Sequence, residues 1–308
     1  MASTPWTFTP LPPLPPALFP NIAFYNATSS ASPNLTYQIS LSYPFEWGAP
    51  TLPTTAITNR TAQTIYVLDG NAFATTASEF LKRRKPVDPA QPDSLVVGIG
   101  YPLTDSVYAL TQRAIDFGAP IPGSPVPFGA PAFLDFIDLH LRPWVRDDVF
   151  PGVNFSRDAI YGHSSGGLFV TWALINRPDM FDTWIAASPS LTLRNGTVGE
   201  LTTRFGDGIN IEGEVEWAEN KTRPAVFIGF GELEDYPVRK RTQTEAQFQT
   251  RRNLLQRFTP GKWSHEFYDR LVGSGQMRDV VLKGYEGQEH AGVGGSALLD
   301  GIAYFLDW

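Results

Sequence analysis

The chain of 308 residues lacks cysteine, long apolar runs and an excess of basic residues. Without cysteine it can form no disulfide, although this leaves an oxidising compartment open. No stretch approaches the roughly 20 uninterrupted apolar residues that a membrane helix needs, so we expect a soluble protein. The formal net charge of −7 argues against a nucleic-acid or membrane partner, because both require a basic surface. A small-molecule partner is therefore expected.

A secretion signal is also missing from the first residues, MASTPWTFTPLPPLPPALFP. They contain neither a basic segment nor an apolar one, and their prolines oppose a signal helix, so we expect a cytoplasmic protein. The alternative is secretion, because six asparagines begin the Asn-x-Ser/Thr pattern of glycosylation sites. They are Asn26, Asn34, Asn59, Asn154, Asn195 and Asn220.

The apolar content suffices for a substantial buried core, since 42% of the residues are hydrophobic. We predict one domain over residues 36–308. Residues 1–35 are rich in Pro, Ser, Thr and Asn, which predicts an irregular arm laid over the surface. The alternation in TYQISLSYP, residues 36–44, is typical of a half-buried edge strand.

Short runs rich in Val and Ile then alternate with helical patterns. Continuous apolarity is typical of parallel strands that are covered on both faces, so the alternation predicts a doubly wound α/β sheet with helices on both faces. The predicted buried strands are residues 64–70, 94–101, 158–162, 183–188, 225–230 and 279–285. The predicted helices are residues 71–84, 130–145, 166–178, 242–258 and 295–308.

Two segments interrupt this alternation. Residues 102–130 are rich in Pro and Gly, and residues 191–222 are a polar insertion. Long loops in compact domains are often functional, with disorder as the rival explanation. Both segments flank the predicted carboxyl edge of the sheet, where α/β folds bind ligands.

The segment YGHSSGGLF, residues 161–169, contains the pattern G-x-S-x-G between a predicted strand and a predicted helix. Ser164 occupies the serine position. A nucleophile elbow holds its serine in a strained turn and needs neighbours without bulk, which Gly162 and Gly166 supply. We therefore predict Ser164 as the nucleophile and the backbone N–H of Ser165 as an oxyanion donor.

A serine nucleophile needs a base, which in this arrangement follows it in the chain. His290 lies just beyond the last predicted strand and before the final helix, and it is the predicted base. His140 precedes the serine in a helical pattern and is interpreted as a packing or surface residue. His163 is too close to Ser164 in the chain, and His265 lies at a predicted helix start.

The acid that orients the base is expected after the strand at residues 225–230. Glu232, Glu234 and Asp235 all follow it, and we select Glu234 because the chain must first leave the sheet before a side chain can turn toward His290. The second oxyanion donor is expected after an early strand, and the N–H of Asn71 is the candidate. This mechanism requires no metal and no cofactor.

The chain resembles the putative-esterase family of α/β-hydrolases, which includes the bacterial enterobactin esterases. The resemblance extends over roughly residues 36–305. The matching segments are YVLDGNAFATTASEF, VVGIGYP, Arg113 and Asp116, FLDFIDLHLRPWV, YGHSSGGLFVTWAL, RPDMFDTWIAASPSL, FIGFGELE and YEGQEHAGV. The chain departs from the family where Thr192, Leu193 and Arg194 follow S-P-S-L, a place where aromatic residues are frequent.

This resemblance implies an α/β-hydrolase fold and, within the family, similarity to fungal intracellular esterases of the hydroxamate siderophore triacetylfusarinine C. Such an enzyme cuts the ester links of the iron-loaded siderophore through an acyl-enzyme and so releases the iron, which is cargo and not a cofactor. One alternative is a general short-chain carboxylesterase or acyltransferase. Another is a catalytically inactive hydrolase that only binds ligands. The oligomeric state stays open.

Overall fold

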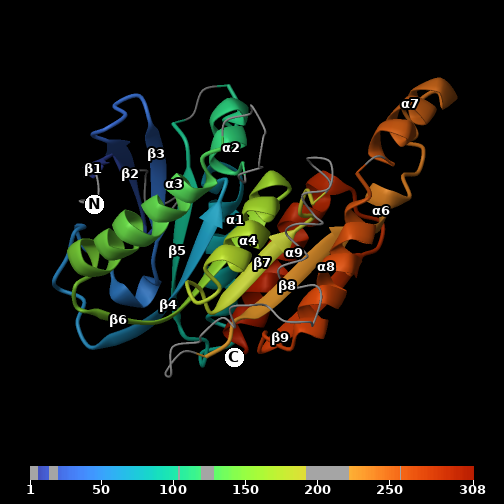
Figure 1. Ribbon diagram of the computed structural model, residues 1–308. Coiled ribbons are helices and arrows are strands. Elements are labelled where there is room, and N and C mark those ends of the chain that lie inside the picture. The colour runs from blue at the N-terminus through green and yellow to red at the C-terminus, as the bar shows by residue number, and fades with distance from the viewer. Residues whose placement is uncertain (1–5, 14–19, 103–104, 119–127, 192–221, 257) are drawn as a thin grey trace. The chain divides into compact units, whose positions relative to one another are not determined.

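The computed structural model describes residues 6–13, 20–102, 105–118, 128–191, 222–256 and 258–308 (Figure 1). Two compact units make up the chain. The first comprises Met1–Ile160 with Phe305–Trp308, and the second comprises Tyr161–Tyr304. Within the described residues, no helix combines the length and the apolar character that crossing a membrane requires.

The first unit contains strands hydrogen-bonded in the order β1-β2-β3-β5-β4. The strands β1, β2 and β3 are antiparallel to their neighbours, whereas β4 and β5 are parallel, with Ala62 opposite Asp93 and Leu68 opposite Ile99. The bounds are β1 Trp6–Pro10, β2 Ile22–Ser29, β3 Thr36–Ser42, β4 Arg60–Leu68 and β5 Asp93–Gly100.

Helices cover both faces of this part of the sheet. Tyr37 packs against Phe133 of α3, with ring centroids 5.2 Å apart, whereas the Ser42 hydroxyl binds the hydroxyl of Ser78 in α1 at 2.5 Å. Because residues 37 and 42 differ by an odd number, they point to opposite faces of β3. The bounds are η1 Phe45–Trp47, α1 Gly70–Arg84, α2 Leu110–Asp116, α3 Ala130–Phe136, η2 Ile137–Leu141 and η3 Trp144–Val149.

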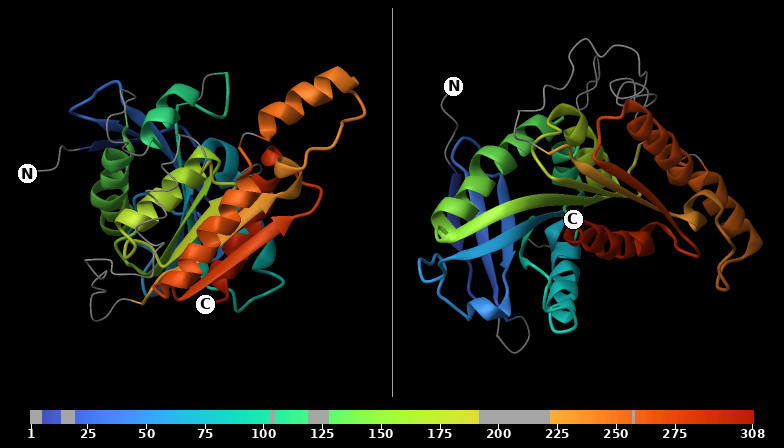
Figure 2. Two further views of the ribbon diagram at one scale, coloured as in Figure 1. Left: turned by 45° about the vertical axis from the view of Figure 1, so that its right-hand side comes forward. Right: turned by 90° about the horizontal axis from the view of Figure 1, so that it is seen from below.

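In the second unit, β7, β8 and β9 are parallel neighbours. The helix α9 packs closely on them, because a Cβ at Gly301 would lie 2.3 Å from the Ile185 side chain. Figure 2 shows α9 on the opposite face of these strands from α4 and α8. The strand β6 runs from the first unit into the second. The bounds are β6 Val153–His163, α4 Ser165–Asn176, β7 Thr183–Ala187, β8 Ala225–Gly231, α6 Glu232–Asp235, α7 Glu245–Leu255, α8 Pro260–Ser274, β9 Asp279–Tyr285 and α9 His290–Leu306.

The N-terminal segment differs from the prediction. An irregular arm over residues 1–35 is wrong for the described part, since β1 and β2 lie in it, and β3 is not an edge strand because β2 and β5 flank it. The reason is visible in β2, where Tyr25, Ala27 and Ser29 alternate as buried residues despite the polar composition. A period of two placed these residues in the sheet although Asn, Ser and Thr surround them.

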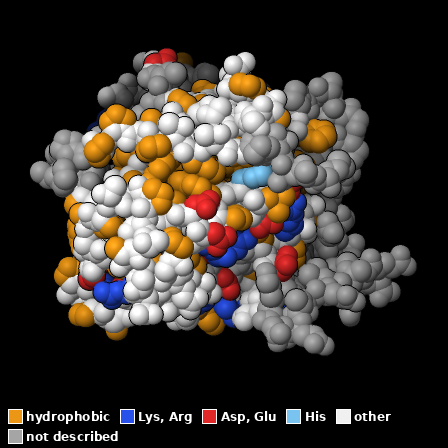
Figure 3. All heavy atoms as spheres, turned by 90° about the vertical axis from the view of Figure 1, so that its left-hand side faces the viewer, with side chains coloured by type: hydrophobic (Ala, Val, Ile, Leu, Met, Phe, Trp, Pro, Cys, Tyr) orange, Lys and Arg blue, Asp and Glu red, His pale blue; other side chains and the backbone are white. Residues whose placement is uncertain are grey.

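The aromatic residues of β1 line a shallow hollow of about 560 Å³ together with Trp144 and Leu139. Phe8 stacks on Trp144 with centroids 4.0 Å apart. Figure 3 shows hydrophobic side chains gathered on one face of the molecule.

Of the two predicted insertions, residues 102–130 contain the helix α2, and residues 192–221 lie outside the described part of the chain.

Candidate active site

The sharp turn between β6 and α4 carries Ser164. Its backbone has φ 59° and ψ −116°, a left-handed φ that a non-glycine residue rarely adopts. Gly162 makes this turn possible, because a Cβ there would lie 2.2 Å from the carbonyl oxygen of Gly166. The strand-turn-helix predicted around Ser164 is therefore confirmed, and the backbone is strained at the serine itself.

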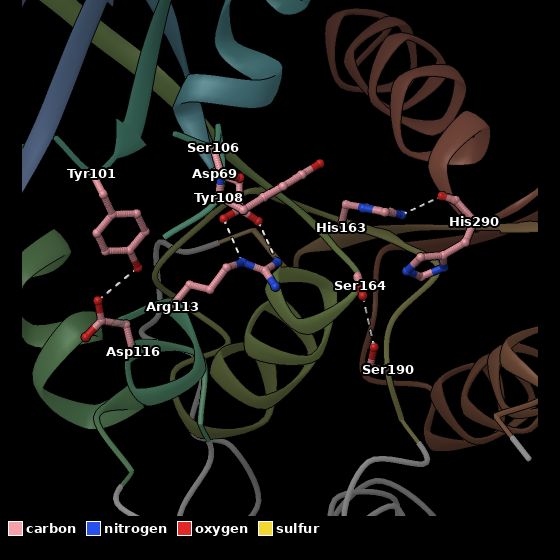
Figure 4. A network of polar contacts seen from close by, with 10 residues as sticks. All are labelled: Asp69, Tyr101, Ser106, Tyr108, Arg113, Asp116, His163, Ser164, Ser190 and His290. Carbon is pink, nitrogen blue, oxygen red and sulfur yellow. Dashed lines mark hydrogen bonds and ion pairs between the residues drawn. The ribbon is translucent and has the colours of Figure 1, made fainter. Parts of the chain in front are cut away.

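Sequence reasoning missed two serines that follow β7, Ser188 and Ser190, and Ser190 contacts the turn directly. The Ser164 N–H donates to the Ala187 carbonyl at 2.9 Å, and the Ser164 carbonyl accepts from the Ser190 N–H at 3.0 Å. The hydroxyls of Ser164 and Ser190 share a hydrogen bond of 3.2 Å (Figure 4). The available signal was a Ser-Pro-Ser triplet at residues 188–190, directly after a buried strand.

His290 is the first residue of α9, and its Nδ1 contacts a carboxylate oxygen of Glu234. The carboxylate oxygen can only accept, so Nδ1 carries the proton and Nε2 of the neutral ring presents its lone pair. The side chain of Glu234 is 3% exposed and that of His290 is 43% exposed. A buried acid thus holds a half-exposed imidazole in one tautomer.

The second oxygen of Glu234 accepts from two donors, one at the start of its own helix and one from a distant segment. The Gly231 N–H donates to it at 2.7 Å, and the Ser188 hydroxyl also donates to it. Both Glu234 oxygens are therefore hydrogen-bonded, which fixes the plane of the carboxylate. Ser188 itself has φ 39°, so the chain is strained where it supplies this donor.

The other two acidic candidates occupy different environments. Asp235 accepts from the N–H groups of Gly261 and Lys262 at 3.0 and 2.9 Å, which places its carboxylate at the N-terminus of α8. Glu232 is exposed at the start of α6. Of the three candidates, the described contacts bring only Glu234 to His290.

Of the other three histidines, only His163 contacts His290. Its Nε2 donates to the main-chain carbonyl of His290 at 2.8 Å, and the two rings are 4.5 Å apart (Figure 4). His163 therefore supports the start of α9 as well as the turn. His265 is exposed on α8, with its ring against Phe230, and His140 lies in η2 near Trp6.

Ser164, Glu234 and His290 line one cavity of about 540 Å³ in the second unit. Figure 4 shows the Ser164 hydroxyl and the His290 imidazole at this site. The other lining residues are Ser190, Leu233, Lys240, Arg251, Leu255, Phe258, Pro260, Glu289 and Ala291. The cavity joins the predicted nucleophile, base and acid to a space of the size that small-molecule sites have.

Asn71 belongs to the first unit. It lies in the first turn of α1, where a backbone N–H has no acceptor within the helix. Its side chain is engaged, since Oδ1 accepts from the Tyr101 N–H at 2.8 Å and Nδ2 donates to Gln38 at 3.1 Å. Ser165 is the first residue of α4, so its N–H also has no acceptor within its helix.

Two pairs of hydrogen-bonded polar side chains lie in the first unit, and one of them includes Asp69, which directly precedes α1. Arg113 donates to both oxygens of Asp69 at 2.9 and 2.7 Å, and the Tyr101 hydroxyl donates to Asp116 at 2.9 Å (Figure 4). Burial raises the pKa of Asp69, and the hydrogen bond and charge of Arg113 oppose this shift. Sequence reasoning took Arg113 and Asp116 from the resemblance alone, without these partners.

Comparison with known proteins agrees with this geometry. Residues 49–279 match the family described as "Putative esterase". The siderophore enterobactin esterase of Emericella nidulans is 34% identical over 98% of each chain. The siderophore triacetylfusarinine C esterase of Aspergillus fumigatus is 30% identical over 88% of this chain and 89% of its own.

Among solved structures, the siderophore hydrolase EstA from Aspergillus nidulans matches with a TM-score of 0.84 and 34% identity, covering 96% of this chain and 97% of its own. The predicted α/β-hydrolase fold, with a mostly parallel sheet and helices on both faces, is confirmed. The chain belongs to the putative-esterase family of carboxylic ester hydrolases.

Proposed function

We propose that the protein hydrolyses an ester through an acyl-enzyme formed on Ser164. The observation that carries this proposal is the contact of His290 with the buried Glu234 at the cavity that Ser164 also lines. His290 takes the proton of the Ser164 hydroxyl as that hydroxyl attacks the ester carbonyl, and Glu234 stabilises the imidazolium that forms. His290 then protonates the leaving alcohol and activates the water that releases the acid.

The N–H groups of Ser165 and Asn71 are proposed as the oxyanion donors. Each belongs to the first turn of a helix, so neither has an intrahelical acceptor, and the positive end of the helix dipole favours negative charge there. A donor aimed at the developing oxyanion contributes about 3 kcal/mol to the transition state. Both contributions come from the main chain, so side-chain substitution does not remove them.

The proposed substrate is an iron-loaded hydroxamate siderophore of the triacetylfusarinine C type, whose cleavage releases the iron. Two relatives with siderophore ester hydrolysis in their names, one of them a triacetylfusarinine C esterase, support this class of substrate. The iron is cargo of the substrate. The cytoplasmic location stays a prediction that the resemblance to intracellular esterases implies.

The substrate is tested by incubating the protein with an iron-loaded cyclic tri-ester siderophore and, separately, with a simple aryl ester. We expect ring opening of the siderophore with a kcat/KM above that for the aryl ester, because the cavity of about 540 Å³ is large for a short acyl chain. Mass spectrometry of the products measures this. Cleavage of the aryl ester alone would identify a general carboxylesterase instead, and binding without cleavage would identify an inactive hydrolase.

Replacing Glu234 with Gln is expected to lower kcat by about 10⁴-fold, as for an orienting acid that is replaced by its amide. The amide nitrogen cannot accept from Nδ1 of His290, so the ring loses the tautomer that presents a lone pair to Ser164. Kinetics on an aryl ester measure the loss. Asp235→Asn and Glu232→Gln are the matched controls, because neither carboxylate contacts His290. An equal loss in Asp235→Asn would show that the acid is assigned wrongly.

A further inference from the structure

The cavity has a basic wall, formed by Lys240 and Arg251, on which the proposed mechanism does not depend. Both residues line the same cavity as Ser164 and His290. The Lys240 ammonium lies 2.8 Å from one oxygen of Glu289, and Arg251 lies 3.1 Å from the other. Two cations thus share one carboxylate beside the base.

Lys240 and Arg251 outnumber the carboxylate that they contact, and the other carboxylate that lines the cavity, Glu234, is buried and bound to His290, Ser188 and Gly231. The hydrogen bond and charge of Lys240, with Arg251, lower the pKa of Glu289, so its carboxylate is ionised at neutral pH and cancels only one of the two cations. The surrounding segment, residues 238–252, contains five Lys or Arg residues and one Glu, whereas the chain as a whole has a net charge of −7. The basic character is therefore local to this side of the cavity.

The two cations are held in different ways, and each way suits ligand binding. Arg251 is anchored, because its guanidinium also donates to the Val238 carbonyl and its side chain is 19% exposed. Lys240 has a side chain that is 50% exposed, and Glu289 accepts from one of its three N–H groups. The ammonium can therefore contact a ligand without leaving its partner.

A purely structural role would be to fasten α7 to the start of α9. No residue of α7, all of which the structure describes, is buried, so this helix stands out from the unit in Figure 1 and gains from a tether. One cation would suffice to neutralise Glu289, however, and the Lys240 side chain is 50% exposed, so its ion pair contributes little to stability. A tether therefore does not explain why a second cation lines the cavity.

We propose that the basic wall binds an anionic oxygen group of the ester substrate and makes the enzyme selective for negatively charged esters. The inference rests on the proposed ester hydrolysis at Ser164. Two sources of such a group fit siderophore esters: the catecholate oxygens of a ferric catecholate, and the carboxylate that hydrolysis itself leaves when one ester of a cyclic tri-ester has been opened. Neutral ferric hydroxamates carry such a group only in the second case.

The decisive experiment compares p-nitrophenyl pentanoate with mono-p-nitrophenyl glutarate, whose acyl chain ends in a carboxylate where the other ends in a methyl group. The measure is the ratio of kcat/KM for the charged ester to kcat/KM for the neutral one. We expect this ratio to fall about tenfold in Lys240→Gln and in Arg251→Gln, as for loss of one charge-assisted contact. Added salt should lower the wild-type ratio and have less effect in the double variant.

Arg252→Gln is the matched control, since it removes the same charge from the next position of α7, which is exposed and does not line the cavity. We expect it to keep the wild-type ratio. The proposal is overturned if Lys240→Gln and Arg251→Gln slow both esters equally, which is the signature of a tether, or if Arg252→Gln changes the ratio as much as Arg251→Gln does.

The source of the anion is identified with three siderophores: a ferric tris-catecholate tri-ester, a neutral ferric tris-hydroxamate tri-ester, and the linear product of opening one ester of the latter. Faster cleavage of the catecholate than of the cyclic hydroxamate would identify the ferric centre. Faster cleavage of the linear hydroxamate than of its cyclic parent would identify the new carboxylate. If no siderophore is cleaved while the aryl-ester ratio responds as expected, the basic wall stands and the siderophore assignment fails.

Discussion

Replacing Ser164 with Ala is expected to lower kcat for ester hydrolysis by a factor on the order of 10⁶, the loss seen when a triad serine is removed. The methyl group of alanine cannot form the acyl-enzyme. Alanine removes only the hydroxyl and its 3.2 Å hydrogen bond to Ser190, so the fold should persist. Hydrolysis of an aryl ester measures the loss, and retained binding of the substrate shows that the variant is folded.

Ser190 is the alternative nucleophile that the experiment must test, because its hydroxyl lies in the same cavity and is hydrogen-bonded to that of Ser164. An organophosphonate should label Ser164 in the wild type, as located by mass spectrometry of the peptides. Ser190→Ala should keep the label and Ser164→Ala should lose it. Hydrolysis at the wild-type rate in Ser164→Ala, or a label on Ser190, would refute the nucleophile.

The elbow around Ser164 could be predicted from the sequence because its requirements are local. Small residues such as Gly162 must stand where backbone approaches backbone, and a buried strand must precede and a helix follow. The same holds for the parallel strands, whose continuous apolar runs identify them. The strands β1 and β2 escaped prediction because their polar composition hides a period of two, which becomes decisive only when β1 pairs with β2 and β2 pairs with β3.

The contacts that position the acid could not be predicted in the same way. Glu234 differs from its neighbours by the donors it meets, the Ser188 hydroxyl and the Gly231 N–H, and the first of these comes from a distant segment. Asp235 is equally acidic in sequence but lies at the N-terminus of α8. A choice among adjacent carboxylates depends on packing between segments that are far apart in the chain, which composition and spacing do not encode.

Replacing His290 with Ala is expected to lower kcat about as much as the loss of the serine, again on the order of 10⁶-fold. Without the imidazole, no described group in contact with Ser164 can take its proton, since the hydroxyl of Ser190 is itself a poor base. The substitution also leaves the buried Glu234 without its ring partner, although Ser188 and Gly231 still donate to the other oxygen. Steady-state kinetics on an aryl ester measure the loss, and thermal unfolding separates it from a change in stability.

The double variant Ser164→Ala/His290→Ala makes the test sharper, because a nucleophile and its base act as one unit. Once either residue is removed, the other no longer contributes to catalysis, so the double variant should be no slower than each single variant. The remaining rate would come from substrate binding and the main-chain donors of the oxyanion site. Losses that multiply would mean that Ser164 and His290 act independently, and His290 would then have a role other than activating this serine.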